Sequence, residues 1–283
     1  MLPTPCHIIS DVHLGAAAPD VERRLLSYLR ALPESAASLV INGDLFDFWF
    51  EWRRVIPRAA FRVVAELARL RELSVPVVWV AGNHDCWGGD FLREDVGVDY
   101  RLEPWVGRIG PWRTRIEHGD GLRPVADRPY RRLRAVLRNP LSIRAFRLLH
   151  PDLGAALASG SAHASRSYRP ADGGAELSGI GIRQLDDAGD LDLLVFGHSH
   201  ASSLTRTPGG GVFANAGSWL ERPECLVVTD ERIRLLPVDE SGRVLAEGHS
   251  LHRIDAGAQE ASAQDEHLFG GVGGDEAVPH DDA

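Results

Sequence analysis

The chain has 283 residues, 44% of them hydrophobic, and a formal charge of −9 with a pI near 5.7. At roughly 100–200 residues per domain, this length predicts one large domain or two small ones and is ample for a self-sufficient core. The composition excludes a wholly disordered chain, a collagen and a disulfide-framework miniprotein. The acidic balance argues against a nucleic-acid binder, so we expect no nucleic acid among the partners.

The basic residues and the cysteines narrow the chemistry further. All 31 basic residues are arginine, which excludes any mechanism that needs a lysine amine. The three cysteines, Cys6, Cys86 and Cys225, are odd in number and far apart, which predicts reduced thiols. The longest apolar run, near residues 75–81, is far shorter than the ~18 residues of a transmembrane helix. We therefore expect a cytoplasmic protein.

Strand and helix patterns alternate over the first 117 residues. Short β-branched runs predict buried strands, and runs with a 3.6-residue period predict helices between them. The expected helices are 21–32, with Asp20 as N-cap, and 61–73, with Phe61, Val64, Leu67 and Leu70 on its apolar side. In chain order, the expected strands lie at 6–9, 38–41, 75–80 and 113–117. This alternation is typical of an α/β fold.

The pattern changes at residue 122. Residues 122–185 carry 11 arginines against four acidic residues, a net charge of +7 that leaves −16 for the rest of the chain. Helical stretches are expected near 130–137 and 143–149. Strand character returns at 191–196, 211–214, 226–229 and 233–237. We predict one domain over residues 1–255 with a helical, arginine-rich insert at about 122–185, followed by an acidic, disordered tail at 256–283.

Five short segments, each following a predicted strand, end in residue types that bind metals. They are Asp11-Val12-His13, Gly43-Asp44-Leu45-Phe46-Asp47, Gly82-Asn83-His84-Asp85, His118-Gly119-Asp120 and Gly197-His198-Ser199-His200. Loops at the carboxyl ends of strands in an open α/β sheet converge on one crevice. Carboxylate, imidazole and amide ligands suit Mn²⁺, Fe²⁺, Zn²⁺ or Co²⁺ better than Ca²⁺. An aspartate shared between two ions would hold them ~3.5–4 Å apart, as in two-metal hydrolysis.

Each segment alone has a plainer interpretation. Asp-x-His occurs by chance, Gly-Asp after a strand is often a turn, and two histidines in Gly-His-Ser-His fit a surface loop. Asn83 and His84 are more informative, because such side chains are costly beside a buried strand unless they are paired. The order and spacing of all five segments together favour one metal site.

The ordered set DxH, GDxxD, GNHD, H-GD and GHSH resembles the calcineurin-like metallophosphoesterases over roughly residues 6–237, apart from the insert. The resemblance implies a four-layer αββα sandwich with a helical lid insert and two divalent metal ions, with Mn²⁺ expected and Fe, Zn or Co as alternatives. It implies Asp11, His13, Asp44 and His200 as ligands of one ion, and a bridging Asp44 with Asn83, His118 and His198 for the other. It also implies His84 as a catalytic general acid or phosphate-contacting imidazole.

Two further acidic residues flank these positions. Asp47 and Asp85 are candidates to orient the imidazoles, with ordinary loop capping as the equal alternative. Cys86, beside Asp85, is expected to be a structural buried thiol.

The sequence around Asp44 narrows the substrate. Asp44-Leu45-Phe46-Asp47-Phe48-Trp49 is similar to the bacterial UDP-2,3-diacylglucosamine diphosphatases of lipid A synthesis and unlike the GDxVDRG of phosphoprotein phosphatases. Those diphosphatases also carry a helical insert between the lone histidine and GHxH. They often have arginine at the position of His84, so cyclic nucleotides and other small phosphodiesters remain an alternative. A non-catalytic scaffold is a third, disfavoured because every ligand position is filled.

The insert fits an anionic lipid substrate. Arg131, Arg134 and Arg138 recur at i, i+3 and i+7 and are predicted to bind a diphosphate, while Leu133 and Leu137 lie on another face that suits acyl chains. The alternative is a lid that packs its own core under a solvated basic face. The aromatic residues near Trp49 and Trp87 are expected mainly in the core, with some near the site. The lipid hypothesis places the protein peripherally on the inner membrane surface.

Overall fold

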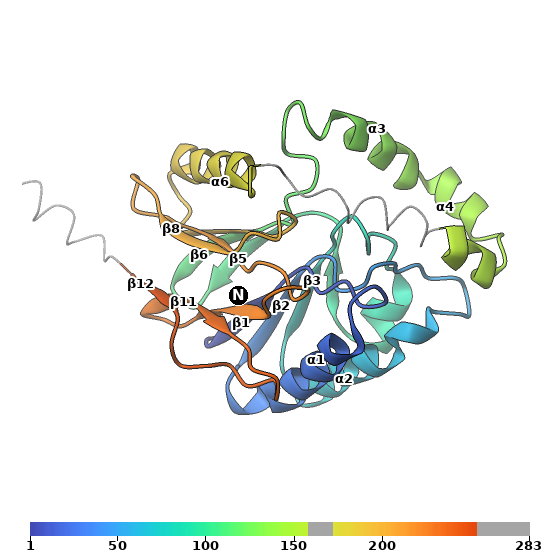
Figure 1. The fold of residues 1–283 in the computed structure, drawn as a ribbon, viewed down its shortest axis with the longest axis horizontal. Coiled ribbons are helices and arrows are strands. Elements are labelled where there is room, and N and C mark those ends of the chain that lie inside the picture. The colour runs from blue at the N-terminus through green and yellow to red at the C-terminus, as the bar shows by residue number, and fades with distance from the viewer. Residues whose placement is uncertain (158–171, 254–283) are drawn as a thin grey trace, which may run out of the picture.

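Two β-sheets, with helices against their outer faces, make up the fold of the computed structural model (Figure 1). The structure describes residues 1–157 and 172–253. The predicted acidic tail at 256–283 lies outside the described residues. The helices are α1 (Pro19–Ala31), α2 (Phe61–Glu72), α3 (Arg128–Leu137), α4 (Pro140–Phe146) and α6 (Ala175–Ala188), with short turns at η1 (Leu32–Glu34), η2 (Arg58–Ala60) and η3 (Phe91–Asp95).

The larger sheet has seven strands in the order β12-β11-β10-β1-β2-β3-β4, and the smaller has five in the order β5-β6-β7-β9-β8. Strands β1 to β4 run parallel, as do β6, β7 and β9. The bounds are β1 (Cys6–Ile9), β2 (Ser38–Asn42), β3 (Val77–Val80), β4 (Asp99–Arg101), β5 (Trp105–Ile109), β6 (Trp112–Ile116), β7 (Leu193–Phe196), β8 (Ser203–Arg206), β9 (Val212–Asn215), β10 (Glu224–Val228), β11 (Arg232–Pro237) and β12 (His249–His252).

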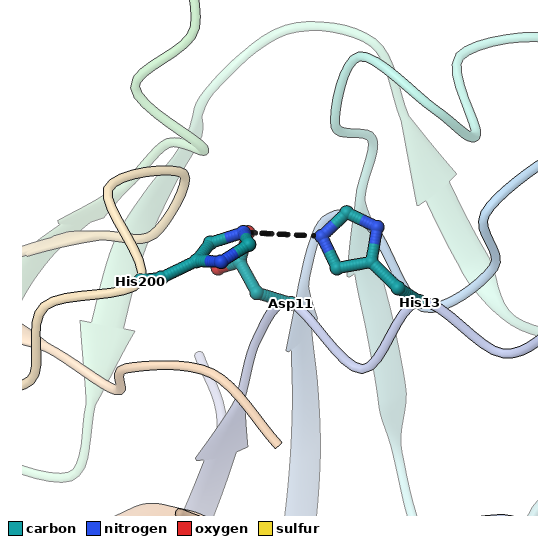
Figure 2. A group of neighbouring side chains, drawn as sticks. All are labelled: Asp11, His13 and His200. Carbon is teal, nitrogen blue, oxygen red and sulfur yellow. Dashed lines mark hydrogen bonds and ion pairs between the residues drawn. The ribbon is translucent and has the colours of Figure 1, made fainter. Parts of the chain in front are cut away.

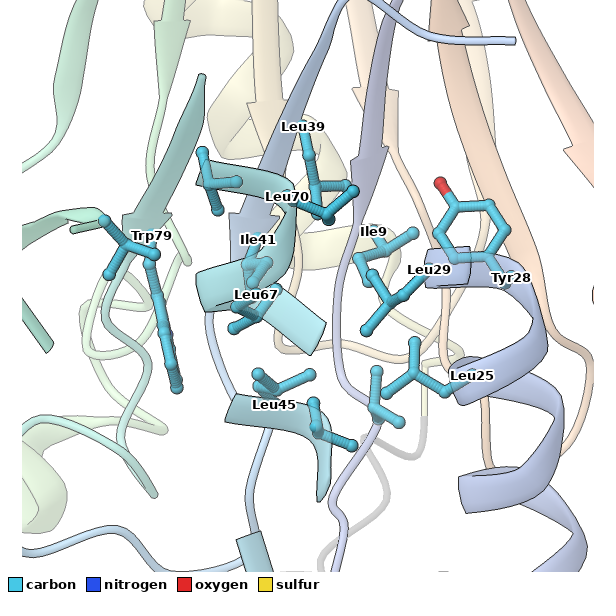
Figure 3. Close-up of a cluster of buried hydrophobic side chains, with 14 of the residues drawn as sticks. Ile9, Leu25, Tyr28, Leu29, Leu39, Ile41, Leu45, Leu67, Leu70 and Trp79 are labelled. Atoms are coloured by element: carbon cyan, nitrogen blue, oxygen red, sulfur yellow. The ribbon is translucent and has the colours of Figure 1, made fainter. Parts of the chain in front are cut away.

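Alternation along the strands builds three packed cores. Ile8 and Val40 face the second sheet and pack in one cluster with its Ile116 and Val195. The next residues along the same strands point the other way. Ile9, Leu39 and Ile41 meet the helices α1 and α2 (Figure 3), whose Leu25, Leu29, Leu67 and Leu70 fill the cluster.

The third cluster completes the layers. Leu177 and Leu185 of α6 pack on Leu194, Phe196 and Phe213 of the smaller sheet. The order helix, sheet, sheet, helix confirms the predicted α/β class and the four-layer αββα sandwich.

The structure corrects two details of the predicted helices. Helix α1 begins at Pro19, and its N-cap residue is Ala18, so Asp20 lies inside the first turn and is not the cap. A proline at the first helical position needs no partner for an amide hydrogen, which explains the earlier start. Phe61 is 66% exposed. At 100° per residue it lies on the opposite side of α2 from the buried Val63, Leu67 and Leu70.

The insert leaves the sandwich with α3 and α4 beside the carboxyl ends of the strands, and residues 151–157 are also helical (Figure 1). Neither α3 nor α4 contains a buried residue. They match the predicted helical stretches within three residues at each end. No helix among the described residues has the length and apolar character needed to cross a bilayer.

Candidate metal centre

Each of the five motifs follows a strand, as the sequence predicts. Asp11 and His13 follow β1, Asp44 follows β2, Asn83 and His84 follow β3, His118 follows β6, and His198 and His200 follow β7. Strands β1, β2 and β3 are adjacent and parallel, and β6 and β7 are adjacent and parallel in the other sheet. The topology therefore brings the motifs from both sheets to one edge of the sandwich.

The backbone at this edge is strained. Among the described residues, six non-glycine residues have positive φ, and five of these are predicted metal ligands. They are Asp11 (52°), His13 (50°), Asp44 (53°), His198 (62°) and His200 (60°). Left-handed backbone costs an L-residue roughly 1 kcal/mol or more. Such clustering of strain is typical of functional sites.

The first group of ligands comes from two loops. Figure 2 shows the His13 and His200 rings turned toward each other above Asp11. His13 Nε2 and His200 Nε2 are 3.2 Å apart, and His200 Nε2 lies 3.4 Å from Asp11 Oδ1. The ligand atoms of these three residues lie close enough together to hold one metal ion.

Asp44 connects this group to a second one. Its Oδ2 lies 3.8 Å from His13 Nε2 and 3.3 Å from His118 Nε2. Asp44, His118 and His198 form another group with metal-binding spacing, and the rings of His118 and His198 are 5.2 Å apart. This position of Asp44 agrees with the implied bridging role.

Unpaired buried atoms provide a test of whether metal ions fit. Within the described part of the chain, Asp11 Oδ1, Asn83 Oδ1 and His118 Nε2 are buried without a hydrogen-bond partner. Leaving such groups unpaired is costly, and a cation would satisfy all three. Two carboxylates, four imidazoles and one amide suit two divalent ions of the Mn, Fe, Zn or Co type. The residues therefore fit the expected two-metal site.

Hydrogen bonds to the backbone fix how the ligands point. His118 Nδ1 donates to the Asn42 carbonyl at 2.9 Å, which leaves Nε2 directed at Asp44. Asp11 Oδ2 accepts from Ser10 Oγ and from the His198 amide at 3.0 Å, which leaves Oδ1 available to an ion. Such outer contacts set the orientation and basicity of metal ligands.

Ser10, Asn42 and Ser218 support the site without having been predicted. Ser10 Oγ also lies 2.8 Å from the Asn42 carbonyl oxygen, so its single hydrogen is shared between that oxygen and Asp11, and Ser218 Oγ donates to the Asp11 carbonyl at 2.9 Å. Ser10 follows the buried strand β1 and Asn42 ends the buried strand β2. A polar residue at such a position indicates a contact with the site and could have been used to predict both. Ser218 is 207 positions from Asp11, and only the tertiary fold joins them.

Three motif glycines are required by close approach. A Cβ at Gly43 would lie 2.7 Å from His118 Cγ, and one at Gly82 would lie 2.7 Å from the Asp44 amide nitrogen. A Cβ at Gly197 would lie 2.8 Å from Asp11 Oδ2. Each glycine therefore lets a metal-ligating loop pass directly beside a ligand of another loop.

The two flanking carboxylates differ in what they contact. Asp47 Oδ1 lies 3.8 Å from His13 Nδ1 and 3.7 Å from His84 Nδ1, between two imidazoles that it could orient as predicted. The hydrogen bonds of Asp85 go elsewhere: it accepts from Leu45 N at 2.9 Å, Gly82 N at 2.7 Å and Trp79 Nε1 at 3.2 Å. Asp85 thus ties the loops after β2 and β3 together.

His84 has the geometry expected of a group that faces the site. Its Nδ1 donates to the Asp47 carbonyl at 2.9 Å, so Nε2 is the nitrogen available to a substrate. The ring meets the His13 ring edge-on, with centroids 4.9 Å apart. The ligand atoms of His13, Asp44 and His84 also lie close together.

The charges at the site stabilise one another. Burial would raise the pKa of Asp44, but the His118, His84 and His13 imidazoles hold it well below its usual range. Burial would lower the pKa of His118, yet Asp44 and Asp11 raise it well above its usual value. Burial lowers the pKa of His13 to about 4.

The three insert arginines lie at the base of the lid. Arg131 Nη1 donates to the Arg123 carbonyl at 2.6 Å, and Arg134 Nη1 donates to the Asp120 carboxylate at 3.3 Å. Arg138 Nη2 lies 3.7 Å from the same carboxylate. Their contact with a substrate stays a prediction.

Aromatic side chains join the second motif to the lid. Phe146 of α4 packs against Phe48, Phe50 and Trp52, and the Phe50 and Phe146 ring centroids are 4.8 Å apart. Trp49 is fully buried, as expected of a core residue.

The fold and this arrangement of ligands define a metal-dependent phosphoesterase site. A family model described as "Calcineurin-like phosphoesterase" matches residues 4–202, and the chain belongs to that family. This membership confirms the class predicted from the motifs, a metal-dependent phosphoester hydrolase.

Two curated relatives carry the same name. The chain is 34% identical over 164 residues to a UDP-2,3-diacylglucosamine hydrolase of Porphyromonas gingivalis, a match that covers 56% of this chain and 63% of that protein. It is 26% identical over 239 residues to a UDP-2,3-diacylglucosamine hydrolase of Pseudomonas putida strain F1, covering 83% of this chain and 99% of that protein. Among solved structures, a single mutant of Vps29 from Entamoeba histolytica matches with a TM-score of 0.43 and 18% identity, over 88% of this chain and 99% of that one.

Proposed function

We propose that this protein hydrolyses the pyrophosphate bond of UDP-2,3-diacylglucosamine, releasing UMP and a lipid monosaccharide phosphate. The observation that carries the proposal is the ligand set at the strand ends, in which Asp11 Oδ1, Asn83 Oδ1 and His118 Nε2 are buried with no hydrogen-bond partner in the described chain. The names of the curated relatives support this substrate.

The chain's own residues supply distinct functions in this reaction. Bound divalent ions would neutralise phosphoryl oxygens and activate the attacking water. Asp44 would hold both ions, and His13 and His118 would complete one coordination shell each. His84, when protonated on both nitrogens, would keep Nδ1 on the Asp47 carbonyl and donate a hydrogen bond or proton from Nε2 to a phosphoryl or leaving-group oxygen.

The lid suits a substrate with a lipid part. Its outer surface exposes Leu133, Val136, Leu141 and Leu148, which are 52–88% exposed, together with the exposed Arg132 and Arg144. Apolar side chains interspersed with cations favour an anionic lipid surface. On this basis the protein would act peripherally at the cytoplasmic face of the inner membrane.

The test compares two substrates. Purified protein, with Mn²⁺ or with chelator, is incubated with UDP-2,3-diacylglucosamine and separately with bis-p-nitrophenyl phosphate, and His118→Ala is the control. Metal-dependent UMP release that His118→Ala abolishes is the expected result. Turnover of the artificial diester alone would reject the lipid substrate and favour a small-phosphodiester hydrolase. Absence of bound metal and of any turnover would favour a scaffold.

A further inference from the structure

Helix α3 is held to the rest of the protein chiefly by polar contacts. None of its residues is buried, so hydrophobic burial contributes little to its position. Trp87 Nε1 donates to the Leu137 carbonyl at its C-terminal end, at 3.0 Å. At the other end, Arg131 donates to the Gly121, Arg123 and Pro124 carbonyls.

The centre of this attachment is the Asp120 carboxylate. It is 7% exposed, and its Oδ2 accepts from Tyr130 Oη at 2.6 Å and from Arg134 Nη1 at 3.3 Å. Arg138 Nη2 lies 3.7 Å from the same oxygen. Arg134 also donates to the Asp120 carbonyl at 3.1 Å. One carboxylate thus contacts two successive turns of α3 and lies near its C-cap residue Arg138, and hydrogen bonds between charged groups are the stronger kind.

These attachment points belong to the loops that carry metal ligands. Asp120 is two residues beyond His118, in the loop after β6. Trp87 follows the Asn83-His84-Asp85 segment in the loop after β3. The position of α3 is therefore fixed by the loops of the metal centre and not by the outer surface of the sandwich.

We propose that Asp120 is a positioning residue that fastens α3 beside the metal centre, with Arg134 and Arg138 as its partners on the lid. This assigns the two arginines to holding the lid, where the sequence predicted contact with a diphosphate. Only the kinetic part of the test rests on the proposed function. The contacts between α3 and Asp120 are present whatever the substrate is.

The first measurement is amide hydrogen exchange of the full chain with Mn²⁺ and without substrate. Asp120→Asn and Arg134→Met should each speed exchange across 128–137 by about tenfold, the effect of losing one charge-assisted hydrogen bond. Arg132→Met is the matched control, because Arg132 is exposed on the same helix. The double variant should exchange more slowly than two independent effects would give, since the bond between Arg134 and the Asp120 carboxylate is lost in both single variants.

Kinetics separate positioning from a general structural role. In Arg134→Met, KM for UDP-2,3-diacylglucosamine should rise several-fold while kcat and bound metal are retained. A raised KM without faster exchange would identify Arg134 as a substrate contact and overturn the proposal. Unchanged exchange in both variants, or equal acceleration in Arg132→Met, would also overturn it. If the lipid is not a substrate at all, the exchange experiment still decides.

Discussion

Gly82→Ala isolates the consequence of moving Asp44 without removing any metal ligand. Gly82 does not need a left-handed backbone, so alanine is acceptable to the chain itself. The new methyl group would lie 2.7 Å from the Asp44 amide nitrogen and 2.8 Å from its Cγ, and would overlap Oδ1. The substitution therefore acts only by pushing the aspartate that bridges the two ligand groups.

The size of the effect follows from this overlap. Non-bonded heavy atoms are in best contact at about 3.5 Å, so Asp44 has to retreat by roughly 1 Å. Overpacking of this kind costs about 1–3 kcal/mol, or a fall in Tm of roughly 2–10 °C for a chain of this size. A displacement of 1 Å in a catalytic arrangement lowers the rate by about 100-fold.

Three measurements follow the variant: the Mn²⁺ bound per chain, the Tm with Mn²⁺ and with chelator, and kcat/KM for a diester substrate. We expect fewer bound ions and a much smaller rise in Tm with Mn²⁺ than in the parent protein. The control is Gly179→Ala in α6, whose Cβ would meet only the end of the Arg183 side chain at 3.4 Å. A helical glycine-to-alanine change should stabilise by about 0.5–1 kcal/mol and leave metal binding intact.

The reasoning would be refuted if Gly82→Ala bound two ions per chain and kept the Tm and rate of the parent. Asp44 would then be free to move, and its position between the two ligand groups would not determine metal binding.

Three further outcomes are expected. Saturation with Mn²⁺ at 100 times the Kd should stabilise the chelator-treated protein by about 2.7 kcal/mol per site, measured by urea unfolding; no shift would argue against a metal centre. Asp85→Ala should lower the unfolding free energy by about 3–5 kcal/mol, because three buried donors lose their acceptor, and Asp85→Asn should lose less. Burial and the Arg234 charge lower the pKa of His7 from 6.5 to about 4. Between pH 4 and 6.5 the unfolded chain therefore binds a proton at His7 that the native chain does not. The contribution of neutral His7 to the free energy of unfolding is fully present above pH 6.5, and about 3 kcal/mol of it is lost as the pH falls to 4. His7→Gln should flatten that acid-side slope, and an unchanged slope would assign it to other groups.

The sequence predicts the core strands, and the place of the expected ligands at their ends, for the same physical reason. Buried parallel strands are continuous β-branched runs, and the ligands must follow them directly, as Asp11 follows β1 and His198 follows β7. The same patterns do not predict the strands β4, β5, β8 and β12. Each of these lies at an edge of its sheet and pairs with one strand only, the strand next to it in the chain, so it lacks the continuous β-branched run of a strand buried between two neighbours.

The contacts that support the site were beyond the sequence. Ser218 reaches Asp11 across 207 positions, and no local pattern encodes that contact. For Asp85 the sequence left two roles open, orienting an imidazole or capping a loop. Its carboxylate accepts from backbone amides of two loops, and only the packing of β2 beside β3 brings both loops within its reach.

Five of the expected metal ligands have a left-handed backbone, and this affects how such a site can be retained during evolution. At roughly 1 kcal/mol each, their backbone opposes folding by about 5 kcal/mol in total, a large share of the stability of an ordinary domain. Glycine at any of these positions would relax the chain, so random substitution and selection for stability alone would both drive the site toward loss. A chain that no longer used its metals would be free to become more stable by discarding Asp11, His13 or His200. All five are present in this chain.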